Sequence, residues 1–86
     1  MRTLEVKITS PNGMNSRQAA ELVAEANLFK SNITMVTANE QADLKSIMDV
    51  MVTVVREGEV FTIEIEGEDE ERAYEAYQKL LQTVRF

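Results

Sequence analysis

The strongest constraint on the fold is an alternation of apolar and polar residues in two segments at opposite ends of the chain. It is clearest at residues 61–66 and recurs at 4–8. Side chains along a strand point to opposite faces in turn, so each segment predicts a strand with one apolar face. Strands of a parallel sheet covered on both sides would be apolar throughout. We therefore predict an antiparallel sheet with helices packed on one side, the α+β class.

Five further segments complete the predicted order of elements. Apolar residues at steps of three and four positions predict one helix around 19–26 and a last helix around 73–84. We also predict strands near 32–37 and 40–43 and a short helix at 46–52, after which Val54 and Val55 lead into a turn. The order is strand, helix, strand, strand, short helix, strand, helix. A chain of 86 residues has room for a single domain, 1–86.

Composition excludes most metal and enzyme chemistry. The sequence has no cysteine and no histidine, which excludes disulfides, thiolate or imidazole metal sites, and nucleophiles of these two types. The acidic run at 66–71 lacks the alternating spacing of a calcium-binding loop. We interpret it as a strand end and the start of the last helix, which Asp69 is predicted to cap. We expect no metal, no cofactor and no enzymatic activity.

The charge is unevenly distributed along the chain. Residues 1–56 carry six acidic and six basic side chains, whereas residues 57–86 carry nine and three. The net charge of −6 argues against nucleic acid or an anionic membrane as a partner. The first residues lack the apolar block of a signal peptide, and no apolar run approaches the roughly 18 residues of a membrane helix. We therefore expect a cytoplasmic protein.

The start of the first helix allows two interpretations. Asn15 is a favoured N-cap residue, and Gln18 three positions later completes a capping-box pattern. Arg17 fits this purely structural role less well, because a cation in the first turn opposes the helix dipole. Arg17 beside exposed backbone N–H groups also predicts a clamp for an anion. The sequence leaves both interpretations open.

The start of the short helix shows a similar pattern. Ser46 with Asp49 three residues later is again typical of a capping box. A serine at a helix start is also a favourable place for a phosphate group, which would meet the positive end of the helix dipole. The apolar residues that follow are too many for one buried stripe, so some should form an exposed partner surface; they are Ile47, Met48, Val50 and Met51.

Several segments together resemble the HPr family, the phosphocarrier proteins of the bacterial phosphoenolpyruvate-dependent sugar phosphotransferase system. The matching segments are residues 13–20, 26–33, 45–51 and 67–70. The family resemblance implies an open-faced sandwich of four antiparallel strands with three helices on one face. It also implies a phosphoryl group carried on a histidine at the position of Asn15. Asparagine keeps the capping role but cannot act as the nucleophile, since its amide lone pair is delocalised.

Two further departures accompany the missing histidine. Gln18 stands where the family has a proline, and Asp49 where it usually has glycine or lysine. Loss of the histidine with retention of Ser46 resembles the Crh-like variants of the family. That likeness implies phosphorylation of Ser46 by HPr kinase/phosphorylase. It also implies a role in carbon catabolite regulation through a LacI-type catabolite control protein.

The likeness implies a docking face for these partners, made of Asn15, Ser16, Arg17, Lys45, Ile47, Met48 and Met51. An alternative is a divergent paralogue that binds partner proteins without phosphorylation, with Ser46 serving only as a helix cap. A third interpretation, phosphoryl transfer through Ser16, is unfavourable because phosphoserine is much less labile than phosphohistidine. A homodimer is compatible with all three.

Overall fold

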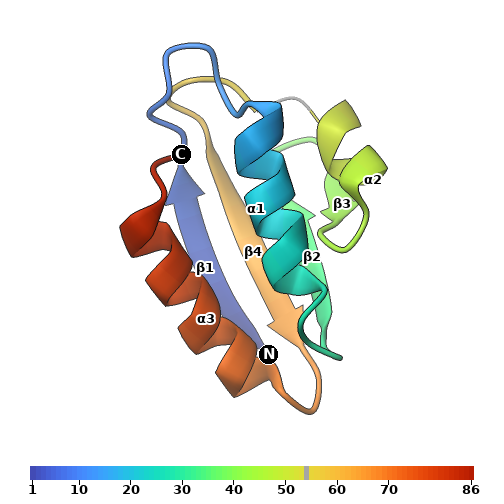
Figure 1. The fold of residues 1–86 in the computed structure, drawn as a ribbon. Coiled ribbons are helices and arrows are strands. Elements are labelled where there is room, and N and C mark those ends of the chain that lie inside the picture. Colours follow the sequence, from blue (N-terminus) through green and yellow to red (C-terminus); the bar gives the residue numbers. More distant parts are fainter. Residues whose placement is uncertain (54) are drawn as a thin grey trace.

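The computed structural model describes residues 1–53 and 55–86, so Val54, expected to lead into a turn, lies outside the described residues. The predicted order of elements is confirmed (Figure 1). The elements are β1 (Arg2–Lys7), α1 (Ser16–Ala26), β2 (Asn32–Val36), β3 (Gln41–Asp43), α2 (Ile47–Val52), β4 (Val60–Glu66) and α3 (Glu70–Thr83).

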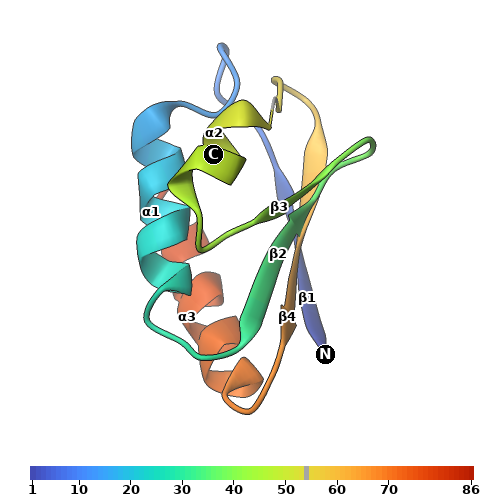
Figure 2. The same cartoon turned by 90° about the vertical axis from the view of Figure 1, so that its right-hand side faces the viewer.

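The four strands form one sheet in the order β1-β4-β2-β3, and each neighbouring pair is antiparallel. All three helices lie on the same face of this sheet, which leaves the other face uncovered (Figure 2). The α+β open-faced sandwich is therefore confirmed. No helix in the described part of the chain is long and apolar enough to cross a membrane.

The core lies between the sheet and the helices. Phe61, Ile63 and Ile65 of β4 are each at most 1% exposed, as their alternation predicts. The register places Ile63 opposite both Leu4 and Met35, so the apolar positions of three strands share one row. This row forms the floor on which the helices pack.

One buried hydrogen bond joins the first and last helices. The hydroxyl of Tyr77 in α3 donates to the carbonyl oxygen of Leu22 in α1 at 2.7 Å. Burial raises the pKa of Tyr77 far above its usual value, so the phenol remains protonated and acts as a fixed donor. Both side chains are fully buried, so the bond helps to fix α1 relative to α3.

The prediction that the Asp69 side chain caps α3 is wrong. Asp69 stands at the N-cap position, but its side chain makes no cap hydrogen bond. Its carboxylate accepts instead from the backbone N–H groups of Lys30 and Ser31, at 2.8 and 2.9 Å. The Ser31 hydroxyl also donates to it, and together these donors lower the pKa of Asp69 to about 2. The helix start thus clamps the loop before β2 rather than its own first turn.

Candidate functional site

The start of α1 forms the complete capping box that the sequence predicts. Asn15 has extended backbone angles, and its side-chain oxygen accepts from the Gln18 backbone N–H at 2.8 Å. The Gln18 side-chain oxygen accepts in return from the Asn15 backbone N–H at 2.9 Å. The Asn15 amide is therefore engaged in closing the helix end, although residue 15 itself is exposed.

Gln18 does more than the sequence indicates. Its side-chain nitrogen donates to the Ser10 hydroxyl at 3.0 Å and to the Arg85 carbonyl oxygen at 2.7 Å. Gln18 is only 8% exposed, and its amide is hydrogen-bonded at both its oxygen and its nitrogen. It thereby ties together the loop before α1, the helix start and the residues after α3.

A hollow of about 310 Å³ lies beside this helix start. Arg17 lines it from the first turn of α1, and Arg85 lines it from the residues that follow α3. Its remaining lining residues are Asn15, Gln18, Glu21, Thr83 and Val84. Sequence reasoning missed Arg85, because only the packing of α3 beside α1 brings position 85 to position 17.

The start of α2 is capped less completely than predicted. The Ser46 hydroxyl accepts from the Asp49 backbone N–H at 3.3 Å. The reciprocal bond is absent from the described residues, because the Ser46 N–H donates to the Asp43 carbonyl oxygen instead. The Asp49 carboxylate accepts from the Asp43 N–H at 3.4 Å. The capping-box prediction at this start is therefore only half right.

Lys45 joins the start of α2 to the far end of α1. Its ammonium group donates to the Phe29 carbonyl oxygen at 2.7 Å, and its own carbonyl oxygen accepts from the Asn27 side chain at 3.1 Å. These contacts lie at the C-terminal end of α1, whereas Asn15 lies at its N-terminal end. Among the described residues, no hydrogen bond joins the two helix starts, although α1 and α2 contact each other.

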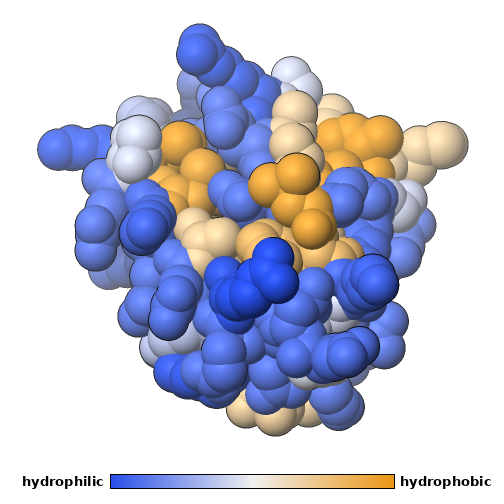
Figure 3. All heavy atoms as spheres, turned by 60° about the horizontal axis from the view of Figure 1, so that its bottom comes forward, coloured by the Kyte–Doolittle hydropathy of each residue, from blue (hydrophilic) through white to orange (hydrophobic). Residues whose placement is uncertain are grey.

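Apolar side chains are exposed along α2, as predicted. Ile47, Met48 and Met51 are 41%, 76% and 51% exposed, while Val50 is buried. Val52 is 73% exposed and was missed, because its position suggested only the end of the helix. Figure 3 views the molecule from the bottom of Figure 1, and apolar side chains gather in the upper part of that view. Exposed methionines of this kind suit an adaptable protein contact.

A model described as "PTS HPr component phosphorylation site" matches residues 3–83 of this chain. The chain belongs to the HPr family. The phosphocarrier protein HPr of Lysinibacillus sphaericus is 42% identical over 81 residues, which cover 94% of this chain and 92% of that protein. The predicted family resemblance is therefore confirmed.

Two solved structures show the same HPr fold. The histidine-containing phosphocarrier protein of Mycoplasma matches with a TM-score of 0.87 at 36% identity, over 95% of this chain and 94% of that chain. Crh of Bacillus subtilis matches with a TM-score of 0.72 at 31% identity, over 100% of this chain and 99% of that chain. That Crh structure is described as a dimer with a swapping domain.

The matched range, residues 3–83, contains both helix starts. The first start carries Asn15, and the chain has no histidine anywhere in its sequence. Within residues 1–53 and 55–86, no group of three or more acidic side chains is placed to hold a metal ion. The first start carries Arg17 and the Ser16 hydroxyl, and the second carries the Ser46 hydroxyl beside exposed apolar side chains.

Proposed function

We propose that this chain is a regulatory member of the HPr family that acts in the cytoplasm by binding other proteins and carries no phosphoryl group at residue 15. The capping box of Asn15 carries this proposal. The Asn15 side chain is held as a helix cap by Gln18 at 2.8 Å, and an amide nitrogen is not a usable nucleophile. A phosphocarrier needs a nucleophile at this place, whereas a binding protein needs only the surface around it.

Incubation with enzyme I and phosphoenolpyruvate, followed by intact mass measurement, tests this part. We expect no mass increase for the wild type. An acid-labile phosphoryl adduct on any residue would overturn the proposal. Asn15→His is expected to give only weak acceptance, because the Gln18 side chain still occupies the N–H of residue 15. Transfer at the rate of a histidine-bearing relative would show that the changed helix start is irrelevant.

We further propose that phosphorylation of Ser46 by HPr kinase/phosphorylase switches the protein. The phosphorylated form would bind a LacI-type catabolite control protein. The Ser46 side chain is only partly buried, and it stands at the N-cap of α2, where a phosphate meets the helix dipole. Ile47, Met48 and Met51 follow it with exposed side chains that can fill an apolar partner surface. The role resembles that of Crh.

The charges around Ser46 favour a second candidate, in which the chain binds partners without modification. The Asp43 and Asp49 carboxylates flank the helix start, where they would oppose a phosphate carrying about two negative charges. The ammonium group of Lys45 is bonded to the Phe29 carbonyl oxygen rather than to either carboxylate.

A kinase assay with HPr kinase and ATP separates the two candidates. Phosphorylation of the wild type and none of Ser46→Ala supports the switch. Asp49→Gly should then be phosphorylated faster, because one opposing carboxylate is removed. Labelling of neither protein supports the unmodified binding protein, whereas equal labelling of wild type and Ser46→Ala would place the phosphate on another residue and overturn the switch at Ser46. Sedimentation of the same samples tests whether the chain forms a homodimer, as the Bacillus subtilis protein does.

A further inference from the structure

We propose that the free edge of β1 binds an extended segment of a partner protein by strand addition. β1 stands at one end of the strand order, so among the described strands it pairs with β4 alone. It is six residues long, whereas β3 at the opposite edge has only three. A long edge strand with unpaired backbone groups is a template for another strand. The inference goes beyond the function proposed above and does not depend on either helix start.

The outward-facing backbone groups of β1 follow from the hydrogen bonds at its end. The Ile8 N–H donates to the Glu59 carbonyl oxygen at 2.9 Å, and the Ile8 carbonyl oxygen accepts from the Gly58 N–H at 2.7 Å. Backbone groups of successive residues in a strand point to alternate sides, so those of Glu5 and Lys7 point away from β4. Within the described part of the chain, no backbone hydrogen bond outside the sheet engages them.

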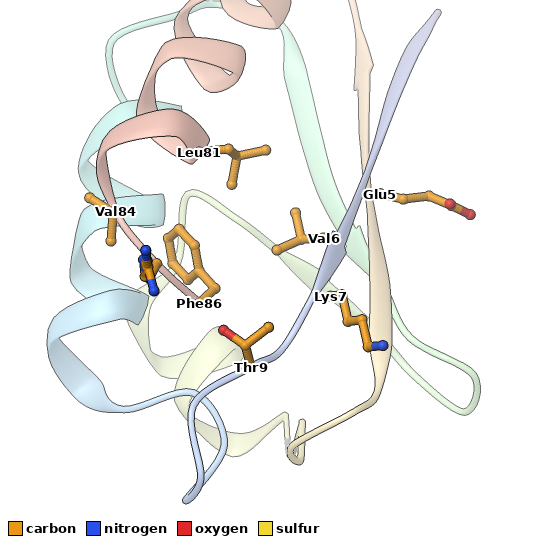
Figure 4. A pocket seen from close by; sticks show the side chains of 8 residues that line it. Glu5, Val6, Lys7, Thr9, Leu81, Val84 and Phe86 are labelled. Atoms are coloured by element: carbon orange, nitrogen blue, oxygen red, sulfur yellow. The ribbon is translucent and has the colours of Figure 1, made fainter.

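A hollow of about 460 Å³ runs along this edge, between β1 and the end of α3. Figure 4 shows Val6 pointing toward the ring of Phe86, while the Glu5 and Lys7 side chains lie on the other side of the strand. Leu81 of α3 extends the apolar lining. A strand added to this edge would therefore place its side chains alternately in an apolar hollow and beside charged residues.

Contacts at both ends hold α3 beside β1, so the hollow is formed in the free protein. At the start of β1, the Arg2 guanidinium lies 3.7 Å from the centre of the Tyr74 ring and pairs with Glu71. At the other end, the Phe86 carbonyl oxygen accepts from the Ser10 N–H at 3.0 Å, and Phe86 is only 4% exposed. A preformed groove lowers the entropy cost of binding a flexible segment.

The position of α3 favours a single extended segment over a second folded copy of this chain. All three helices lie on one face of the sheet, and α3 runs along the outer side of β1 (Figures 1 and 2). A second copy that paired edge to edge would bring its own α3 against this one. An extended segment needs room for only one strand, about 4.8 Å from β1.

The charges along the edge specify the sequence of the segment. Every strand pair of this sheet is antiparallel. In that orientation the partner residue opposite Lys7 should be acidic and the one opposite Glu5 basic, while the residue between them faces the hollow beside Val6 and should be apolar. The segment therefore has the order acid, apolar, base. Arg85, the remaining charged lining residue, follows α3 and lies outside this row of side chains.

Synthetic peptides of about ten residues, a usual strand length, provide the test. They alternate polar and apolar residues around a central Glu-Val-Lys or Lys-Val-Lys. Fluorescence anisotropy should show that the wild type binds the Glu-Val-Lys peptide about fivefold more tightly, the effect of one cross-strand charge pair changing sign. The protein's net charge of −6 would by itself favour the more basic peptide, so overall charge does not produce this preference.

A charge reversal in the protein should reverse the preference. Lys7→Glu is expected to bind the Lys-Val-Lys peptide more tightly than the Glu-Val-Lys peptide. Lys79→Glu, at an exposed lysine of α3, makes the same change in net charge and should keep the wild-type preference. An unchanged preference in Lys7→Glu would overturn the inference.

Methylated peptide amides test the strand pairing without changing the protein. In antiparallel pairing, the N–H groups of the peptide's central Glu and Lys face β1, whereas that of the Val between them faces away. N-methylation of the Glu and Lys amides should weaken binding about tenfold, because two hydrogen bonds are lost. N-methylation of the Val amide should be tolerated. Equal effects of the two modifications would show that the peptide does not bind as a strand of this sheet.

Sedimentation of the protein without peptide tests the competing occupant. We expect no dimer that Lys7→Glu disrupts. Such a dimer, if the Glu-Val-Lys peptide displaced it, would assign the edge to a second copy and overturn the partner segment. These assays contain no phosphoryl donor, so their failure is distinct from that of the proposed function, which fails only if the chain itself gains a phosphoryl group from enzyme I.

Discussion

The two helix starts use the same sequence pattern but differ in how completely it is formed. At α1, Asn15 and Gln18 exchange both bonds of the capping box, at 2.8 and 2.9 Å. At α2, Ser46 receives a single longer bond of 3.3 Å, and the Asp49 carboxylate bonds to the Asp43 N–H instead. The first start is locked, whereas the second keeps a partly exposed hydroxyl and is followed by exposed apolar side chains.

This difference matters for the function proposed above, in which residue 15 carries no phosphoryl group. Where Gln18 supplies a reciprocal cap, residue 15 becomes part of the scaffold and the neighbouring arginines remain available for an anion. Where the cap is incomplete, the Ser46 hydroxyl remains partly exposed. The function proposed above therefore assigns stability to the first start and regulation to the second, and variants at each start can test that division.

The largest effect is expected for Gln18→Ala. Its side chain makes three hydrogen bonds, to the Asn15 N–H, the Ser10 hydroxyl and the Arg85 carbonyl oxygen. Losing them in a buried place should lower the free energy of unfolding by about 2–4 kcal/mol. Urea titration measures the change. Gln82→Ala, at an exposed glutamine of α3, is the matched control and should change stability by less than about 0.5 kcal/mol.

A smaller, pH-dependent effect is expected for Asp69→Asn, at the start of α3. The pKa of Asp69 is lowered from 3.8 to about 2 by the Ser31 hydroxyl and the Lys30 N–H. Because the folded-state pKa lies below the unfolded-state value, ionised Asp69 stabilises the fold above about pH 4. This contribution is lost as the pH falls through about 2. Urea midpoints at pH 6 and pH 2 should differ more for wild type than for Asp69→Asn. An equal pH dependence of both would show that the loop clamp does not stabilise the fold.

The helix starts also show what the sequence alone can predict. Fold class, element order and the Asn15–Gln18 box follow from spacing within a few residues, because periodicity and caps are local. The bond from Gln18 to the Arg85 carbonyl spans 67 positions, and the bonds from Asp69 to residues 30 and 31 span 39 and 38. Such partners depend on how the helices pack on the sheet, and no short pattern encodes them.

A similar limit applies to Ser46 and Lys45. The Ser46–Asp49 spacing correctly indicates a cap, but the tight bend after β3 gives the Ser46 N–H another acceptor, the Asp43 carbonyl oxygen. Lys45 was expected to help bind an anion or a partner, and its ammonium group lies on the Phe29 carbonyl oxygen. The first outcome depends on the turn after β3, and the second on the approach of α2 to α1. A capping pattern alone does not show which of several possible bonds is made.

Asn15→Ala should cost less than Gln18→Ala, because it removes one side-chain acceptor at an exposed position. The loss of the N-cap is expected to lower the free energy of unfolding by about 0.5–2 kcal/mol, and Asn15→Asp should be tolerated. Urea titration of the three proteins tests this order. Equal stability of Asn15→Ala and wild type would mean that the bond to Gln18 contributes nothing and that Asn15 serves binding alone.

The smallest effect is expected for Ser46→Ala, about 0.5 kcal/mol or less. Its bond to the Asp49 N–H is 3.3 Å long and partly exposed, and α2 has only six residues to gain from a cap. Removing the hydroxyl takes the acceptor from the Asp49 N–H, but residue 49 is exposed, so water can replace it and no buried donor is left unpaired. The alanine variant should therefore keep the wild-type urea midpoint while losing any labelling by the kinase. If Ser46→Ala destabilises the fold as much as Asn15→Ala, both starts are structural caps. The division between a locked start and a regulatory start would then be wrong.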